Sequence, residues 1–138
     1  MSRGQRTSAR LLVPFLVTAA AASAAWAAWL GGDDQYDVRP DGSATGPYEA
    51  WQVAGLVLTL LVPVCWAAAR RHPAGAVLGT TAGLTAAAFA DWSDDSSGLF
   101  AVGVGMVALG SLAASAAVAA VVRAVTAAVR RHGRGTTA

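Results

Sequence analysis

Charge is what this sequence lacks most: only 13% of its 138 residues are Asp, Glu, Lys or Arg. A soluble domain carries about 25%, so the chain has roughly half of the charge that a water-facing surface needs. Hydrophobic residues make up 55% of the chain, and the mean hydropathy is +0.49. The few charges come in blocks between long uncharged stretches, a pattern typical of membrane spans joined by short loops.

Several residue types are also rare or absent. The single cysteine, Cys65, excludes a disulfide within the chain and a metal site built from several cysteines. The chain has arginine but no lysine, and it has neither asparagine nor isoleucine. Heavy use of Ala, Gly, Val and Arg is typical of a GC-rich bacterial genome.

Four uncharged stretches predict four transmembrane helices. About 20 residues suffice to cross a hydrocarbon core of about 30 Å. We expect spans over residues 11–30, 50–69, 74–90 and 99–122, with an outer loop at 31–49 and a basic cytoplasmic tail at 123–138. The sequence therefore predicts an all-α fold, a single membrane domain over 1–138 that forms an up-down-up-down four-helix bundle with short loops.

Helix start signals support two of these spans. Gly46 is expected to cap the second span, with Pro47 as its first helical residue and Glu49 in its first turn. Pro73 is placed to open the third span. Pro40-Asp41-Gly42 predicts a turn in the outer loop.

Basic and acidic residues alternate along the chain. The N-terminus, the second loop and the tail carry arginine and no acid (Arg3, Arg6 and Arg10; Arg70 and Arg71; Arg123, Arg130, Arg131 and Arg134). All eight acidic residues lie within 33–49 and 91–95, where Arg39 is the one basic residue and is expected to pair with an aspartate. Arginine-rich loops stay on the cytoplasmic side, so both termini are predicted to be cytoplasmic in a bacterial plasma membrane.

A cleaved signal peptide is the main alternative for the first span. Residues 1–10, the apolar stretch and the small residues Ala22-Ser23-Ala24 resemble its three parts. The apolar run is longer than the usual core of about 7–15 residues. Trp26 and Trp29 have the character of retained interface anchors, which favours a retained span.

Small residues predict how the helices pack. Gly75, Gly79 and Gly83 recur at every fourth position of the third span, and Gly110, Ser111 and Ser115 form similar rows in the fourth. Such rows let helices approach closely in lipid. Because a short turn joins the two spans, we expect their small faces to meet within one chain, with a homodimer seam or a pore lining as alternatives.

Threonines are the main polar residues deep in the third span. We expect the hydroxyls of Thr80, Thr81 and Thr85 to bond to carbonyls of their own helix, three or four residues back. The alternative is that they line a path for a solute.

Charged clusters suggest few sites. The segment from Asp37 resembles a calcium-binding loop, but Arg39 and Tyr48 occupy ligand positions, so no metal site is predicted and only loose cation binding stays open. The basic tail is suited to anionic lipid. It lacks interleaved aromatic residues, so nucleic acid is not expected as a partner.

The spans contain no ionisable group at depth. Ion-coupled transporters and small multidrug exporters generally need one, and a serine or threonine nucleophile needs a base to activate it. We therefore expect no enzyme and no cofactor. The first hypothesis is an accessory or interaction component of the cell envelope, with an unknown membrane partner or self-association; the alternative is a passive oligomeric pore or small-solute carrier.

The stretches at 45–52 (Thr-Gly-Pro-Tyr-Glu-Ala-Trp-Gln) and 94–99 (Asp-Asp-Ser-Ser-Gly-Leu) resemble a group of short four-span membrane proteins from GC-rich Gram-positive bacteria. The resemblance covers most of the chain apart from its termini. It implies a four-span topology and a plasma-membrane location, and no functional residue is carried over from it.

Overall fold

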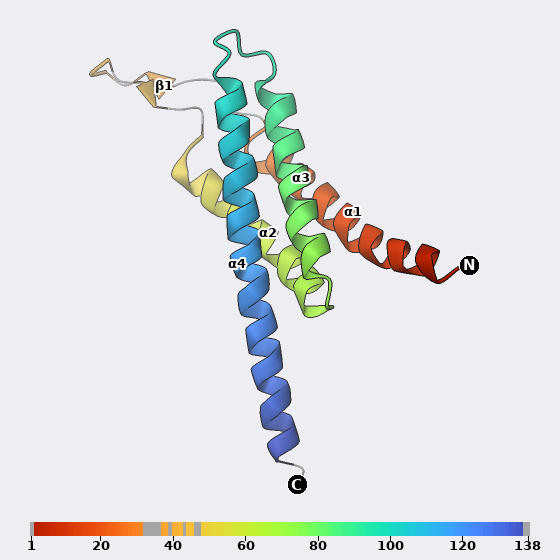
Figure 1. Cartoon of the computed structure of the whole chain (residues 1–138). Coiled ribbons are helices and arrows are strands. Elements are labelled where there is room, and N and C mark those ends of the chain that lie inside the picture. The colour runs from red at the N-terminus through yellow and green to blue at the C-terminus, as the bar shows by residue number, and fades with distance from the viewer. Residues whose placement is uncertain (1, 32–36, 39, 43, 46–47, 137–138) are drawn as a thin grey trace.

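The computed structural model of this chain describes residues 2–31, 37–38, 40–42, 44–45 and 48–136. It contains four helices, α1 (Arg3–Trp29), α2 (Ala50–Ala69), α3 (Pro73–Trp92) and α4 (Phe100–Gly135), shown in Figure 1. All four are long and apolar enough to cross a membrane. The predicted all-α four-helix fold is confirmed.

Helix α1 begins at Arg3, well before the apolar run that starts at Leu11. Ser2 caps it, because the Gln5 N–H donates to Ser2 Oγ over 3.4 Å and the Ser2 N–H donates to Gln5 Oε1 over 3.3 Å. This reciprocal pair satisfies two N–H groups at the start of the helix. Residues 3–10 are therefore an exposed helical extension of the first span.

Helix α2 covers residues 50–69, the second predicted span, but its predicted start signal was wrong. The N-cap is Glu49, whose N–H donates to Gln52 Oε1 over 2.7 Å. A glutamine three residues after the cap is well placed for this bond, which explains why the helix starts here. Gly46 and Pro47 lie outside the described residues.

A two-bond turn joins α2 to α3. The His72 N–H donates to the Ala67 carbonyl over 2.9 Å, and the Arg71 N–H donates to the Ala68 carbonyl over 3.2 Å. This is the Schellman arrangement, which usually has glycine where this chain has Arg71. Arg71 accordingly has a φ of +66°. Pro73 then opens α3, as the sequence predicts.

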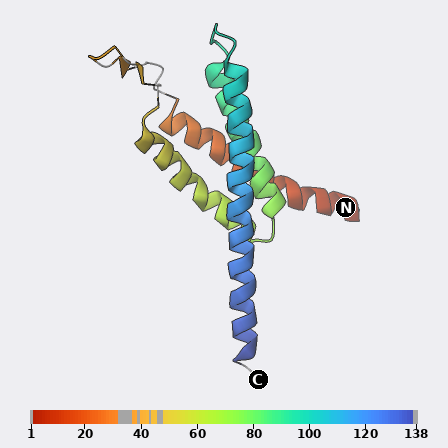
Figure 2. The ribbon, with the colours of Figure 1, turned by 60° about the vertical axis from the view of Figure 1, so that its left-hand side comes forward.

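Helix α4 has 36 residues and is about 54 Å long, well beyond the hydrocarbon thickness of about 30 Å. The predicted fourth span and most of the basic tail are therefore one continuous helix. Arginine and alanine favour helix, and no proline interrupts them. The C-terminal part of α4 projects beyond the other helices in Figure 2.

Helix α3 is the centre of the bundle and contacts α1, α2 and α4. Within the part of the chain that the structure describes, α1 and α4 do not contact each other. The N-terminal end of α1 also projects away from the other helices (Figures 1 and 2). The helices thus form a closed ring in the order α1, α2, α4, α3, in which α1 and α4 lie on either side of α3.

The outer loop contains a short antiparallel pair, β1 (Asp37–Val38) and β2 (Ala44–Thr45), which the sequence does not predict. Asp37 pairs with Thr45, and Val38 with Ala44. The predicted turn between them includes Gly42, whose φ of +83° suits glycine. Asp33, Asp34 and Arg39 lie outside the described residues, so the predicted Arg39 ion pair stays a prediction.

The buried apolar side chains come mainly from α1, α2 and α3. The larger cluster contains Ala22, Ala25, Trp26, Leu30, Leu56, Leu60, Leu84 and Ala88. A smaller one near the α2–α3 turn contains Val64, Ala67 and Ala76. Helix α4 is described over its whole length and buries only Ser115 and Ala119. Most of its surface is therefore left for lipid or for a protein partner.

Candidate functional site

The glycine row of α3 packs against α1, so the prediction that it meets α4 was wrong. A Cβ placed on Gly79 would lie 2.0 Å from Thr18 Oγ1 and 2.4 Å from the Phe15 carbonyl oxygen. A Cβ on Gly83 would lie 2.4 Å from the Ala19 carbonyl oxygen. A short turn makes α3 and α4 neighbours. The backbone that lies closest to the glycines nevertheless belongs to α1.

Hydroxyl groups bridge the same α1–α3 interface. Thr18 Oγ1 donates to the Pro14 carbonyl over 2.8 Å and lies 3.1 Å from the Gly75 carbonyl. Ser23 Oγ donates to the Gly83 carbonyl over 3.2 Å. These bonds depend on glycines that leave their carbonyls accessible.

The threonines of α3 do not make the predicted bonds to their own helix. The Oγ1 atoms of Thr80, Thr81 and Thr85 are buried and have no hydrogen-bond partner among the described residues. By contrast, Thr59 donates to the Gly55 carbonyl over 2.8 Å, so this chain does use such bonds elsewhere. The α3 hydroxyls are therefore unsatisfied hydrogen-bonding groups inside the bundle.

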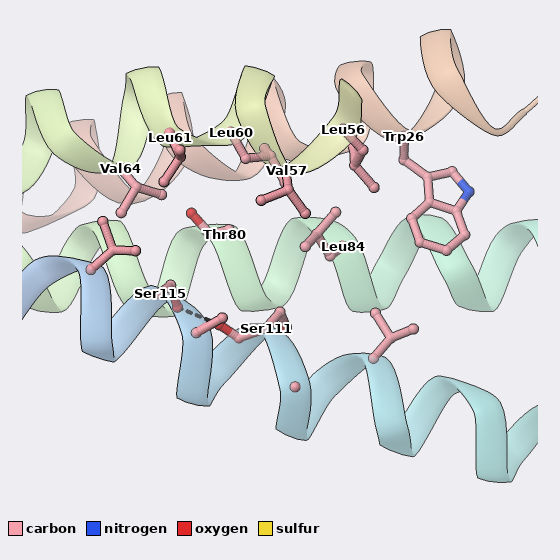
Figure 3. A pocket seen from close by; sticks show the side chains of 14 residues that line it. Trp26, Leu56, Val57, Leu60, Leu61, Val64, Thr80, Leu84, Ser111 and Ser115 are labelled. Atoms are coloured by element: carbon pink, nitrogen blue, oxygen red, sulfur yellow. Dashed lines mark hydrogen bonds between the residues drawn. The ribbon is translucent and has the colours of Figure 1, made fainter. Parts of the chain in front are cut away.

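The first of two hollows beside these threonines is the α2–α4 pocket, which α2, α3 and α4 enclose (Figure 3). Its volume is about 300 Å³, and almost all of its lining surface is apolar. The residues are Trp26, Leu56, Val57, Leu60, Leu61, Val64, Thr80, Leu84, Val107, Gly110, Ser111, Ala114, Ser115 and Val118.

The hydroxyl groups that line the α2–α4 pocket differ in their hydrogen-bond partners. Ser115 Oγ donates to the Ser111 carbonyl over 2.5 Å, and Ser111 Oγ donates to the Ala108 carbonyl over 3.2 Å. Both hydroxyls therefore serve their own helix. Thr80, which is 3% exposed, directs its unpartnered hydroxyl from α3 toward the space beneath α2 (Figure 3).

The second hollow is the α1–α4 groove, which lies on α3 between its neighbours α1 and α4. It has a volume of about 730 Å³, and α3 forms its floor. Its lining comprises Phe15, Leu78, Thr81, Ala82, Thr85, Ala86, Phe89, Val104 and Ala108. Two of the three unpartnered threonine hydroxyls, those of Thr81 and Thr85, belong to these lining residues.

The predicted packing residues of α4 have separate environments. Gly110 is exposed, and a Cβ added to it would meet nothing within 4 Å. Ser111 is half-buried and Ser115 is buried. All three line the α2–α4 pocket instead of facing the row of Gly75, Gly79 and Gly83.

Aromatic residues join helices at the acidic end of the bundle, the end where α2 begins and α3 finishes. Asp91 Oδ2 accepts from Tyr48 Oη over 2.5 Å and from Trp26 Nε1 over 3.3 Å. Trp92 Nε1 donates to Tyr48 Oη over 2.8 Å. Trp26 and Trp92 stack edge to face with centroids 5.6 Å apart. Tyr48 holds this cluster together, although nothing in its sequence neighbourhood identifies it.

The turn after α3 carries two further acids, Asp94 and Asp95. Asp95 Oδ2 accepts from Ser97 Oγ over 2.7 Å, and Asp95 Oδ1 accepts from the Ser97 N–H over 3.0 Å. These bonds from Ser97 hold the pKa of the Asp95 carboxyl below its ordinary value of 3.8. Among the described residues, no group of three His, Cys, Asp or Glu could hold a metal ion.

Arginines gather at the opposite end, which we call the basic end. Arg10, Arg70 and His72 line one hollow, and the Arg70 guanidinium lies 5.8 Å from the Trp66 ring centroid. A second hollow of about 400 Å³, the arginine pocket, has Arg71, Arg123 and Arg130 in its wall. Among the described residues at the helix ends, the structure thus separates basic from acidic side chains between the two ends of the bundle.

Comparison with known proteins gives no assignment for these sites. No family model matches this chain. No curated protein and no solved structure matches it either.

Proposed function

We propose that this chain is a non-catalytic component of a bacterial plasma membrane that binds a transmembrane helix of another envelope protein in the α1–α4 groove. One observation carries the proposal. Thr81 and Thr85, on the face of α3 that forms the floor of the α1–α4 groove, have buried hydroxyls without partners among the described residues. An unsatisfied hydroxyl in an apolar setting is unfavourable, so a helix that offers a polar group there would be stabilised.

The shape of the groove favours a helix as its occupant. Its floor consists of α3 residues at helical spacing from Leu78 to Phe89, a strip about 16 Å long. Ala82 and Ala86 on the floor and Ala108 on the α4 wall are small enough for close helix approach. Each hydrogen bond between helices in a membrane contributes about 0.6–2 kcal/mol.

The orientation of the chain is part of this proposal. Charge segregation places Arg71, Arg123 and Arg130 at one end and Glu49 and Asp91 at the other. The retention of arginine in the cytoplasm supports an arrangement with both termini inside the cell. The GC-rich composition supports a bacterial membrane, in which lipid covers the remaining helix faces.

The residues at depth support a binding role over a catalytic one. The hydroxyls of Thr80, Thr81 and Thr85 are the polar side-chain groups available in the two hollows between helices. No His, Asp or Glu occurs among the lining residues of either hollow to take a proton from them. A hydroxyl without a base donates hydrogen bonds but is a weak nucleophile.

Site-specific photocrosslinking in native membranes tests the proposal. A photoreactive residue replaces Ala86 in the groove, or Val62 on the exposed side of α2 as the matched control. We expect one discrete adduct with a foreign protein from position 86 and none from position 62. An adduct of twice the chain's own mass would show a second copy in the groove, and no adduct at position 86 would contradict the proposal.

A passive oligomeric pore is the second candidate function. The same unpartnered hydroxyls of Thr81 and Thr85 favour it, since water could satisfy them if several copies turned their grooves toward a common axis. Solute flux into liposomes that contain the purified chain separates the two candidates. Flux that Thr85→Val abolishes would favour the pore, whereas tight vesicles would leave the helix-binding role.

A further inference from the structure

The arginine pocket is lined by arginines from distant parts of the chain. Arg71 comes from the α2–α3 turn, and Arg123 and Arg130 come from α4. The rest of the wall is small or neutral: Ala68, Ala69, Pro73, Thr126 and Ala127. Three positive charges therefore border one hollow of about 400 Å³.

Helical spacing explains the α4 side of this pocket. Arg123 and Arg130 are seven residues apart, which is about 10.5 Å along the axis and close to two full turns. Their side chains therefore leave the same face of α4. Thr126 lies between them, and its hydroxyl donates to the Val122 carbonyl of its own helix. Between Arg123 and Arg130, α4 therefore presents a small side chain whose hydroxyl already has a partner in the same helix.

The charges of this pocket have no acidic partner among the residues that the structure describes. Among the described residues, Arg71, Arg123 and Arg130 form no ion pair, and all eight acidic residues of the sequence lie within 33–49 and 91–95. The described acids of helix ends, Glu49 and Asp91, are at the far end of the bundle. Clustered guanidiniums repel one another, so an anion between them is favourable.

The backbone at Arg71 gives an independent reason to assign a role to its side chain. The Schellman turn places this residue at a φ of +66°, a conformation that glycine adopts without strain. A long side chain there is disfavoured by local sterics. Strain at a residue that lines a pocket points to a role for its side chain in that pocket.

We propose that the arginine pocket binds a phosphate group. A guanidinium offers a planar fork of N–H donors that matches two phosphate oxygens at once, and three arginines line the pocket. The pocket lies where α2 ends and α3 begins, at the membrane boundary of a four-span chain, so a lipid headgroup reaches it from the bilayer and a soluble phosphate reaches it from water. This site is separate from the α1–α4 groove and does not depend on the proposed function.

Binding to the purified full-length chain in neutral detergent tests the proposal. One arm titrates phosphatidylglycerol and counts bound lipid by native mass spectrometry. The other titrates inorganic phosphate calorimetrically at constant ionic strength, with chloride as the reference anion. Arg71→Gly and Arg123→Gln each remove one guanidinium from the pocket, and Arg131→Gln removes the same charge from an exposed position of α4 outside it.

We expect saturable binding in at least one arm. Arg71→Gly and Arg123→Gln should each weaken it about tenfold, the effect of one charge-assisted hydrogen bond, while Arg131→Gln changes it less than about twofold. Binding in the lipid arm alone identifies a headgroup as the source, and binding in the phosphate arm alone identifies a soluble anion. Equal losses from all three variants, or no saturable binding in either arm, would overturn the proposal.

Discussion

Thr18 on α1 lies with its hydroxyl oxygen 3.1 Å from the backbone carbonyl of Gly75 on α3, and the two helices meet there almost without intervening side chains. Thr18 is fully buried, and its hydroxyl also bonds to the Pro14 carbonyl of its own helix. The contact exists because the residues of α3 that face it are glycines. The α1–α3 pair is therefore the tightest interface in the bundle and the one most sensitive to added volume.

Gly79→Ala should destabilise the chain. The new Cβ would lie 2.0 Å from Thr18 Oγ1 and 2.4 Å from the Phe15 carbonyl oxygen, and the backbone atom cannot move without shifting α1. We expect the unfolding free energy in detergent micelles to fall by about 1–3 kcal/mol. Gly110→Ala is the control, because its Cβ meets nothing within 4 Å and alanine favours helix. A change in oligomer size without loss of stability at position 79 would show that this face packs between chains.

Tyr48→Phe should weaken the acidic end. The substitution keeps the ring, whose centroid is 6.0 Å from that of Trp26, but it removes the bonds to Asp91 and Trp92. A partly exposed bond to a carboxylate is worth about 1–2 kcal/mol, so the unfolding free energy should fall by that amount. Asp94→Asn changes an exposed residue at the same end and should have an effect below about 0.5 kcal/mol. Equal effects of the two variants would argue against the cluster.

Arg71→Gly should raise the unfolding free energy of the chain. The φ of +66° at this position is costly for a residue with a Cβ, by about 1–2 kcal/mol, and glycine avoids that cost. Part of the gain is lost to the greater freedom of glycine in the unfolded chain. We expect a net rise of about 0.5–1 kcal/mol in the unfolding free energy. Arg70→Gly, at a residue with a φ of −79°, should lower it instead.

The sequence predicted the spans because charge and proline mark their ends. Helix α2 has the bounds of its predicted span since Glu49 and Arg70 flank the uncharged run, and Pro73 begins α3 as expected. The true start of α1 was not predicted because the span was bounded by the charge of Arg10, although Ser2 and Gln5 have the spacing of a capping box. Local signals of this kind place helices along the chain but do not arrange them in space.

The candidate sites were less predictable because they depend on which helices meet. The glycine pattern identified Gly79 as a packing residue, but the pattern is identical whether the partner is α1 or α4. The hydroxyl of Thr80 was expected to bond within its helix, as Thr59 does, and only the side-chain conformation decides this. Arg71 and Arg123 are far apart in sequence, so nothing before the fold places them in one pocket.

Both ends of the chain should face the cytoplasm if charge sets the orientation. Single cysteines at Ser96 and at Thr136, in a Cys65→Ser background, report on the α3–α4 turn and on the end of α4. A membrane-impermeant maleimide should label position 96 in intact cells and position 136 only after permeabilisation. Labelling of both positions in intact cells, or the reverse pattern, would show that arginine does not set the orientation.

Thr80→Val and Thr18→Val should have opposite effects, because valine replaces threonine with little change of shape. Thr18 loses the hydrogen bond that its one hydroxyl proton shares between the Pro14 and Gly75 carbonyls, so its variant should lower the unfolding free energy by about 0.5–1.5 kcal/mol. The Thr80 hydroxyl is buried without a partner, so its removal relieves an unfavourable burial and should raise the unfolding free energy by about 1 kcal/mol. Threonine and valine have similar helix propensities, so the change in unfolding free energy at each position reports on the hydroxyl alone. Tryptophan fluorescence during unfolding in micelles measures both values, and a loss of stability at position 80 equal to that at position 18 would mean that the Thr80 hydroxyl already has a partner inside the bundle.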